Sequence, residues 1–249
     1  MHEPDCGTIV VQSDPSRNAR GSWIPAIVAG LVSFAGFMMC VFCEHQLVTG
    51  TAESPAAEPA RAEEQDPFRI PRQAMVRQQL QGRDITDRRV LTVMERVPRQ
   101  RFVPAHLHHA AYEDHPLPIG HGQTISQPYV VALMTQVAQP KPTARALDVG
   151  TGSGYQAAVL AELCQEVYSI EIVEPLAKEA RQRLADLGYR NVEVRSGDGY
   201  RGWPEHAPFD LILVAAAPDH VPQPLVEQLA RGGRLVIPVG RPFQELLVV

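Results

Sequence analysis

Residues 147–156 read L-D-V-G-T-G-S-G-Y-Q, a glycine-rich segment that indicates the fold class. Three glycines, Gly150, Gly152 and Gly154, occupy alternate positions directly after a short apolar strand predicted over residues 145–149. Glycine has no Cβ, so such a backbone can turn tightly and approach a ligand closely. A helix predicted over residues 156–166 presents its N-terminus to the same place. The stretch therefore predicts a strand, a ligand-binding turn and a helix.

The rest of the chain alternates between strand-like and helical patterns. Further strands are predicted over residues 167–172, 192–195, 211–214 and 234–238, and helices over residues 73–81, 130–137, 175–187 and 225–230, with one more helix beginning at Thr86 as N-cap. This alternation of apolar strands with helices predicts an α/β fold, with a doubly wound, mostly parallel sheet covered on both faces. Ligands of such sheets bind at the carboxyl ends of the strands, where the glycine turn lies.

Acidic residues lie at the ends of three successive predicted strands. They are Asp148, Glu171 and Asp198. The nicotinamide pattern G-x-G-x-x-G fails because position 155 is tyrosine, and Asp148 would repel a pyrophosphate. A positively charged nucleoside without phosphate fits better, with Glu171 binding its ribose hydroxyls and Asp198 its adenine. S-adenosylmethionine is such a molecule, and its predicted site comprises Asp148, Gly150, Thr151, Gly152, Ser153, Gly154, Glu171, Asp198 and Gly199.

Five motifs together resemble those of one family. They are V-P-R-Q-R-F-V-P at residues 97–104, A-Y-E-D-H-P-L-P-I-G at 111–120, G-Q-T-I-S-Q-P at 122–128, L-D-V-G-T-G-S-G-Y-Q-A-A-V-L-A at 147–161 and S-G-D-G at 196–199. From about Met75 to Val249 the chain resembles protein-L-isoaspartate O-methyltransferases. The resemblance implies a class I, Rossmann-like methyltransferase fold. It also implies methyl transfer from S-adenosylmethionine to the free carboxylate of L-isoaspartyl residues in damaged proteins, after which the ester cyclises to a succinimide that reopens partly to aspartate.

The acceptor is expected in the glycine- and proline-rich loop over residues 116–128. The resemblance places the active-site serine at Ser126, and Thr124 is a second candidate. A carboxylate with a pKa of about 4 is already ionised at neutral pH, so the reaction needs positioning rather than a strong base or a metal. A hydroxyl of Ser126 or Thr124 would hold one carboxylate oxygen while the other attacks. The alternative is that Ser126 caps the following helix, and the two roles are compatible.

Two other kinds of function remain open from the residues. One is methyl transfer to a different acceptor, and the other is an inactive cofactor-fold binding module held at a membrane. A net charge of −5 and a pI of about 6.0 give no reason to expect nucleic acid as a partner. His106, His108 and His109 have no cysteine or paired carboxylate at ligand spacing, so we expect exposed histidines and no metal. We expect a monomer.

The N-terminal part differs in composition from the rest. Residues 23–43 carry no charge and are long enough to cross a hydrocarbon core of about 30 Å. We expect a cytoplasmic-type tail over residues 1–22, an uncleaved membrane anchor over 23–43, a disordered Ala/Pro/Glu linker over 44–66 and the methyltransferase domain over 67–249. Flanking charges place that domain outside the cytoplasm, whereas the family is typically cytoplasmic, so its side stays open. A cleaved signal peptide and an internal start at Met75 are the alternatives.

The C-terminal end is predicted to lack a strand. In this family's architecture an antiparallel pair follows the strand at residues 234–238, and residues 244–249, Q-E-L-L-V-V, supply only the first member. The second member would lie between the first and the parallel sheet. We therefore expect residues 246–249 to lack their usual neighbour, the last parallel strand to keep an open edge, and the domain to aggregate more readily.

Overall fold

A seven-stranded sheet organises the protein. The computed structural model describes residues 9–11, 66–216, 218–240 and 245–249. The strands lie in the order β1-β9-β8-β7-β4-β5-β6. Their bounds are β1 Ile9–Val11, β4 Arg145–Val149, β5 Glu166–Glu171, β6 Val192–Ser196, β7 Phe209–Val214, β8 Leu229–Val239 and β9 Glu245–Val248.

Strands β4 to β8 run parallel to one another. The chain winds from β4 through β5 to β6, then returns to the other side of β4 for β7 and β8, so the winding direction reverses between β4 and β7. A reversal of this kind opens a crevice at the carboxyl ends of the two strands. The predicted α/β fold with a mostly parallel sheet is confirmed, and the glycine turn leaves β4 at the reversal point.

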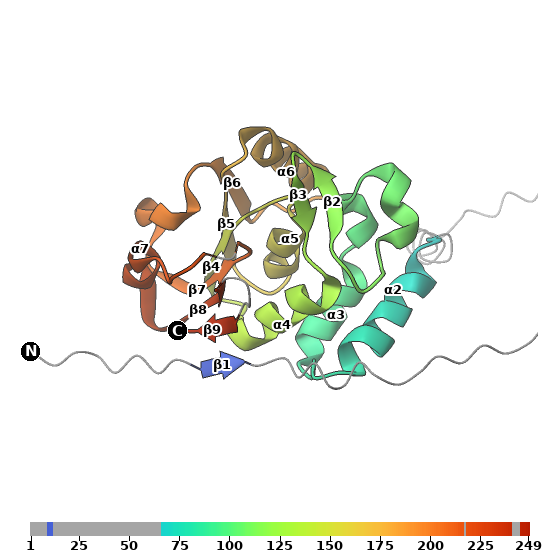
Figure 1. The fold of residues 1–249 in the computed structure, drawn as a ribbon, viewed down its shortest axis with the longest axis horizontal. Coiled ribbons are helices and arrows are strands. Elements are labelled where there is room, and N and C mark those ends of the chain that lie inside the picture. The colour runs from blue at the N-terminus through green and yellow to red at the C-terminus, as the bar shows by residue number, and fades with distance from the viewer. Residues whose placement is uncertain (1–8, 12–65, 217, 241–244) are drawn as a thin grey trace, which may run out of the picture. The chain divides into compact units, whose positions relative to one another are not determined.

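Helices pack mainly on one side of this sheet, as Figure 1 shows for α2, α3 and α4, with α7 on the other side. Their bounds are α2 Arg69–Met75, α3 Arg88–Arg96, α4 Pro128–Ala138, α5 Tyr155–Ala161, α6 Glu174–Asp186 and α7 Gln223–Glu227. A π-helical turn, η2 Val76–Gln81, continues α2, and shorter 3-10 turns are η3 Arg99–Phe102, η4 Ala105–Ala110, η5 Gly199–Arg201 and η6 Pro204–His206.

Alternate residues of the strands belong to two separate apolar cores. Ala146 of β4 and Leu211 of β7 pack in the core shared with α3 to α6. Their neighbours Leu147 and Ile212 pack in a second core with Leu225 of α7. Successive side chains of a strand point to opposite faces, so a sheet buried on both sides needs apolar residues at almost every position. This is why the strands read as short continuous apolar runs.

The predicted cap at Thr86 is wrong by one residue. Asp87 is the N-cap of α3, and its Oδ1 accepts a hydrogen bond of 2.8 Å from the backbone N–H of Arg89. The Thr86 backbone N–H instead donates to Oε1 of Gln136 in α4, at 2.7 Å. The Asp87 backbone N–H donates to the same oxygen at 2.8 Å, and both residue types are good caps.

Part of the predicted loop over residues 116–128 is a β-hairpin. Strand β2, Leu117–Gly120, pairs antiparallel with β3, Gln123–Ile125. Gly120, His121 and Gly122 form the turn with positive φ angles of 93°, 51° and 71°. The glycines that suggested a loop are therefore the turn residues of a hairpin.

The prediction of an open C-terminal edge is wrong. Strand β9 pairs antiparallel directly with β8, with Val236 opposite Val248 and Pro238 opposite Leu246. The other edge of β9 pairs with β1, where Val10 lies opposite Leu247. The apolar residues of β9 gain their partners because β9 lies directly beside β8, with no strand between the two. Leu247 and Val249 accordingly pack against the second core.

The predictions for most of the N-terminal part lie outside the described residues. This holds for the anchor over residues 23–43 and the linker over 44–66, whereas residues 9–11 of the predicted tail form β1. Within the described part of the chain, no helix is both long and apolar enough to cross a bilayer.

Candidate functional site

The glycine turn after β4 is held by the end of β5. The backbone N–H of Gly150 donates to the Ile170 carbonyl at 2.8 Å. Glu171, the last residue of β5, is 4% exposed; its Oε2 accepts from the Gly152 N–H at 2.7 Å and its Oε1 from the Val173 N–H at 2.9 Å. The carboxylate predicted to bind a ribose is thus fixed against the turn, and each of its oxygens keeps a second lone pair for a ligand hydroxyl.

Two glycines lie in close contact with side chains of other elements. A Cβ on Gly199, after β6, would lie 2.3 Å from Cγ1 of Val149 in β4. A Cβ on Gly152, whose φ is 54°, would lie 3.2 Å from Cδ1 of Ile119 in β2. The first contact brings the loop after β6 close to the glycine turn, and the second places the β2–β3 hairpin directly beside that turn.

Asp148 is a fully buried carboxyl group with one free oxygen. Its Oδ2 accepts from Oγ of Ser169 at 2.7 Å, and Ser169 also lies 2.5 Å from Oγ1 of Thr151 in the turn. No described group bonds its Oδ1, nor the buried Oγ of Ser153. Burial raises the pKa of Asp148 to about 7, with Ser169 lowering it and Glu171 adding to the rise. A buried acid of this kind is relieved by a positive charge, so these residues fit a cationic cofactor.

Asp198, the third predicted acid, lies beside the group formed by the glycine turn, Asp148 and Glu171. Asp198 caps the short η5 turn by accepting from the Tyr200 N–H at 3.0 Å, and its side chain is 50% exposed. The preceding Gly197 donates its N–H to the Glu171 carbonyl at 2.9 Å. The structure thus brings Asp148, Glu171 and the glycine turn together, with Asp198 on the adjoining loop and accessible to a ligand.

The two acceptor candidates flank the start of α4. Thr124 is exposed on β3, and Ser126 is half-buried between β3 and α4. The N-cap of α4 is Gln127, without a side-chain capping bond, and Pro128 is the first helical residue. Ser126 therefore does not cap this helix, and its hydroxyl has no hydrogen-bond partner among the described residues.

Residues 116–128, where the acceptor is expected to bind, are called the acceptor segment, and they lie beside the glycine turn. Besides the contact of Ile119 with Gly152, Nε2 of His121 at the hairpin turn lies 3.7 Å from Oε1 of Glu179 in α6. The hairpin therefore covers the region between the glycine turn and α6. Its second strand runs directly into Thr124 and Ser126.

Sequence reasoning missed two residues of this region. Ser169 bonds Asp148 because the two residues lie opposite each other in the β4–β5 register. The available signal was a single serine within an apolar strand, adjacent to the strand that contains Asp148. Arg99 is completely buried and donates from Nη2 to the Ser126 carbonyl at 2.7 Å. Its only signal was its place in the first of the five motifs.

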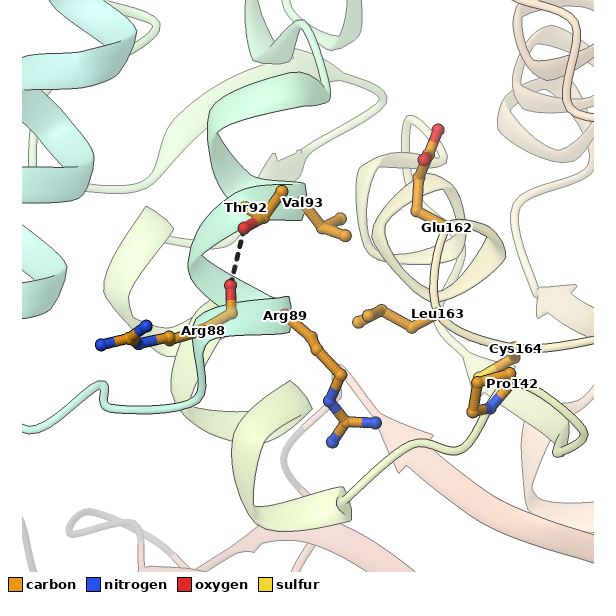
Figure 2. A pocket seen from close by; sticks show the side chains of 8 residues that line it. All are labelled: Arg88, Arg89, Thr92, Val93, Pro142, Glu162, Leu163 and Cys164. Carbon is orange, nitrogen blue, oxygen red and sulfur yellow. Dashed lines mark hydrogen bonds between the residues drawn. The ribbon is translucent and has the colours of Figure 1, made fainter.

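A separate cavity of about 390 Å³ lies at the opposite end of the sheet. Figure 2 shows the eight side chains that line it: Arg88, Arg89, Thr92, Val93, Pro142, Glu162, Leu163 and Cys164. Pro142 precedes β4 and Cys164 precedes β5, so this cavity lies at the amino ends of the strands. Burial raises the pKa of Cys164 to about 12, which leaves the thiol protonated and unreactive. The cavity is therefore distinct from the candidate site.

The fold and site define a class I, S-adenosylmethionine-type methyltransferase. The family model described as protein-L-isoaspartate(D-aspartate) O-methyltransferase (PCMT) matches residues 71–249. This chain belongs to the protein-L-isoaspartate O-methyltransferase family, as its motifs predict. S-adenosylmethionine is the methyl donor of this family.

Similar proteins agree with this assignment. A protein-L-isoaspartate O-methyltransferase of Synechococcus sp. (strain JA-2-3B'a(2-13)) is 61% identical, over 75% of this chain and 76% of its own. That of Opitutus terrae is 61% identical, over 78% of this chain and 80% of its own. Among solved structures, one protein-L-isoaspartate O-methyltransferase matches with a TM-score of 0.63 and 29% identity, over 72% of this chain and 59% of that chain. A Plasmodium falciparum beta-aspartate methyltransferase (PCMT) in complex with S-adenosyl-L-homocysteine matches with a TM-score of 0.61 and 28% identity, over 71% and 87%.

Proposed function

We propose that this protein is an S-adenosylmethionine-dependent carboxyl methyltransferase that repairs proteins containing L-isoaspartyl residues. The observation that supports this most is the position of the β2–β3 hairpin, whose Ile119 lies against Gly152 of the cofactor turn. The segment G-Q-T-I-S-Q-P runs from this hairpin into α4, so it is continuous with the strands that contact the cofactor turn.

The residues around the turn have separate roles in binding the donor. When bound, S-adenosylmethionine supplies a methyl group attached to a positively charged sulfur. When the methyl group is transferred, the sulfur is the leaving group and becomes a neutral thioether. Glu171 would accept the ribose hydroxyls with the lone pairs that Gly152 and Val173 leave free. Asp148 supplies negative charge beneath the turn, and Asp198 lies where an adenine amino group could donate to it.

The acceptor segment positions the attacking carboxylate. The hydroxyl group of Ser126 or Thr124 can donate a hydrogen bond to one carboxylate oxygen, leaving the other oxygen free to attack. Because the carboxylate is already ionised, the protein needs to align it and exclude water. Ser126 is the stronger candidate, since it is half-buried whereas Thr124 is exposed.

Two peptides that differ at one linkage test the substrate. Purified protein is incubated with labelled S-adenosylmethionine and either an isoaspartyl peptide or its aspartyl twin. Labelling of the isoaspartyl peptide alone supports the proposal. Equal labelling of both would indicate a general carboxyl methyltransferase, and no labelling despite intact cofactor binding would indicate a binding module.

The acceptor role of Ser126 has its own test. Ser126→Ala should lower kcat/KM for the isoaspartyl peptide about 10- to 100-fold, because a hydrogen bond to a charged group contributes about 1.5–3 kcal/mol. Affinity for S-adenosyl-L-homocysteine should stay nearly unchanged. Thr124→Val tests the second acceptor candidate in the same assay. Wild-type turnover in Ser126→Ala would remove the serine from the mechanism.

We also propose that residues 23–43 anchor the protein in a membrane and that the protein is a monomer. The support for the anchor is the uncharged apolar composition of that segment. The full-length product should sediment with membranes and resist extraction with alkaline carbonate, and protease added to spheroplasts would report the side of the catalytic domain. A product that stays in the supernatant would refute the anchor.

A further inference from the structure

Arg99 is a buried arginine whose side chain contacts the backbone of the acceptor segment. It lies in η3, its side chain is 0% exposed, and it belongs to V-P-R-Q-R-F-V-P, a motif to which the reaction has assigned no role so far. Its Nη2 donates to the Ser126 carbonyl at 2.7 Å, and its Nε donates to the Ala111 carbonyl at 2.8 Å. One guanidinium group therefore fixes the backbone at the residue proposed to hold the acceptor.

The same guanidinium group also contacts the helix that follows the cofactor turn. Its central carbon lies 4.9 Å from the ring centroid of Tyr155. Tyr155 is the first residue of α5, directly after Gly154, and is itself 2% exposed. Phe102 packs against the Tyr155 ring at 5.4 Å between centroids, which holds the ring in place. Arg99 thus bridges the acceptor segment and the cofactor helix.

Stability alone does not account for a charge at this position. In the described part of the chain no carboxylate lies within ion-pair distance of Arg99, and its Nη1 has no hydrogen-bond partner. Burial lowers the pKa of the guanidinium group, yet arginine stays charged in proteins. Two carbonyls and an aromatic face offset only part of the desolvation cost, and an apolar side chain of similar volume often serves a core equally well.

We propose that Arg99 is a positioning residue for methyl transfer. It holds Ser126 at a fixed place relative to the start of α5, so that the serine hydroxyl meets the acceptor carboxylate in line with the cofactor. Its positive charge, which has no counter-ion among the described residues, also favours a negatively charged acceptor near this segment. This inference rests on the proposed function, in which Ser126 contacts the acceptor.

Two substitutions separate the roles of shape and charge. Arg99→Met removes the charge and both hydrogen bonds, whereas Arg99→Lys keeps the charge and can reach only part of the bonding pattern. Val167→Ala, a buried substitution near the amino end of β5, is the control for a general loss of stability. For each protein we would measure kcat and KM with an isoaspartyl peptide, the Kd of S-adenosyl-L-homocysteine, and amide hydrogen exchange over residues 122–128.

Arg99→Met should lower kcat/KM about 10- to 100-fold with the Kd of S-adenosyl-L-homocysteine within about threefold of wild type, and Arg99→Lys should be intermediate. Exchange over residues 122–128 should be faster in both variants than in Val167→Ala. Kinetics and exchange equal to those of Val167→Ala would overturn the proposal. If Arg99→Met does not fold, unchanged kinetics and exchange in Arg99→Lys would overturn it. An inactive wild-type protein would refute the proposed function, while hydrogen exchange would still test the role of Arg99.

Discussion

Replacing Asp148 with asparagine should change how the stability of the cofactor-free protein depends on pH. Burial raises the pKa of Asp148 from 3.8 to about 7. Between these values the unfolded chain has released the proton and the native state retains it, so the free energy of unfolding falls as pH rises, by about 1.4 kcal/mol per unit. The stability due to the neutral carboxyl is complete below pH 3.8 and is lost by about pH 7. The full loss is about 4 kcal/mol.

Urea unfolding at pH 5 and pH 8 measures this effect. Relative to Asp148→Asn, the wild type should lose about 3 kcal/mol between the two pH values, because about two pH units of this range lie below the native pKa. Asparagine still accepts from Ser169 but places an unbonded NH₂ at Oδ1, which costs about 1–3 kcal/mol at every pH and therefore cancels in the comparison. The exposed Asp198→Asn is the matched control and should follow the wild type. Parallel pH curves for wild type and Asp148→Asn would refute the reasoning.

The same carboxyl group should make cofactor affinity depend on pH. A cationic donor favours the ionised form of Asp148, so its affinity should rise with pH, by at most about tenfold per pH unit, and level off above about pH 7. Asp148→Asn should bind more weakly at pH 8 and lose this dependence. Calorimetry across the range distinguishes the two profiles, and an affinity that does not change with pH in the wild type would contradict a charge–charge role for Asp148.

Two further substitutions test the cofactor turn. Glu171→Ala should weaken cofactor binding by about 1.5–3 kcal/mol, because it removes the carboxylate proposed to bind the ribose and frees the Gly152 N–H; an unchanged Kd by calorimetry would exclude Glu171 from the site. Gly199→Ala should lower both the thermal midpoint and the cofactor affinity, because its Cβ would lie 2.3 Å from Cγ1 of Val149. Gly197→Ala, whose nearest contact would be 3.8 Å away, is the control, and equal behaviour of the two variants would contradict the close approach.

Periodicity and turn chemistry predicted the parts of the fold that depend on local sequence. Strand β4 has the predicted bounds, and Gly188, with φ of 86°, follows the end of α6 as expected. Pairing between distant segments was not predictable. Gln136 of α4 binds the backbone N–H groups of both Thr86 and Asp87 at the start of α3, and β9 pairs directly with β8 although family architecture suggested otherwise.

The residues of the candidate site also fall into those that local sequence predicts and those that depend on contacts between distant segments. Glycines and acids near the carboxyl ends of strands have a recognisable spacing, so the proximity of Asp148 and Glu171 to the turn could be predicted from the sequence. Ser169 and Arg99 could not, because their roles depend on strand register and on a contact between residues 27 positions apart. The role of Ser126 was predicted from the family motif, and the structure adds that no described residue bonds its hydroxyl.

Repair itself is the most direct measurement of the central claim. An isoaspartyl peptide is incubated with the protein and S-adenosylmethionine at neutral pH, and isoaspartyl and aspartyl forms are separated by chromatography over several cycles of esterification. We predict that the isoaspartyl form declines while the aspartyl form accumulates, and that Ser126→Ala slows both changes. An isoaspartyl content that stays constant despite bound cofactor would contradict the assignment.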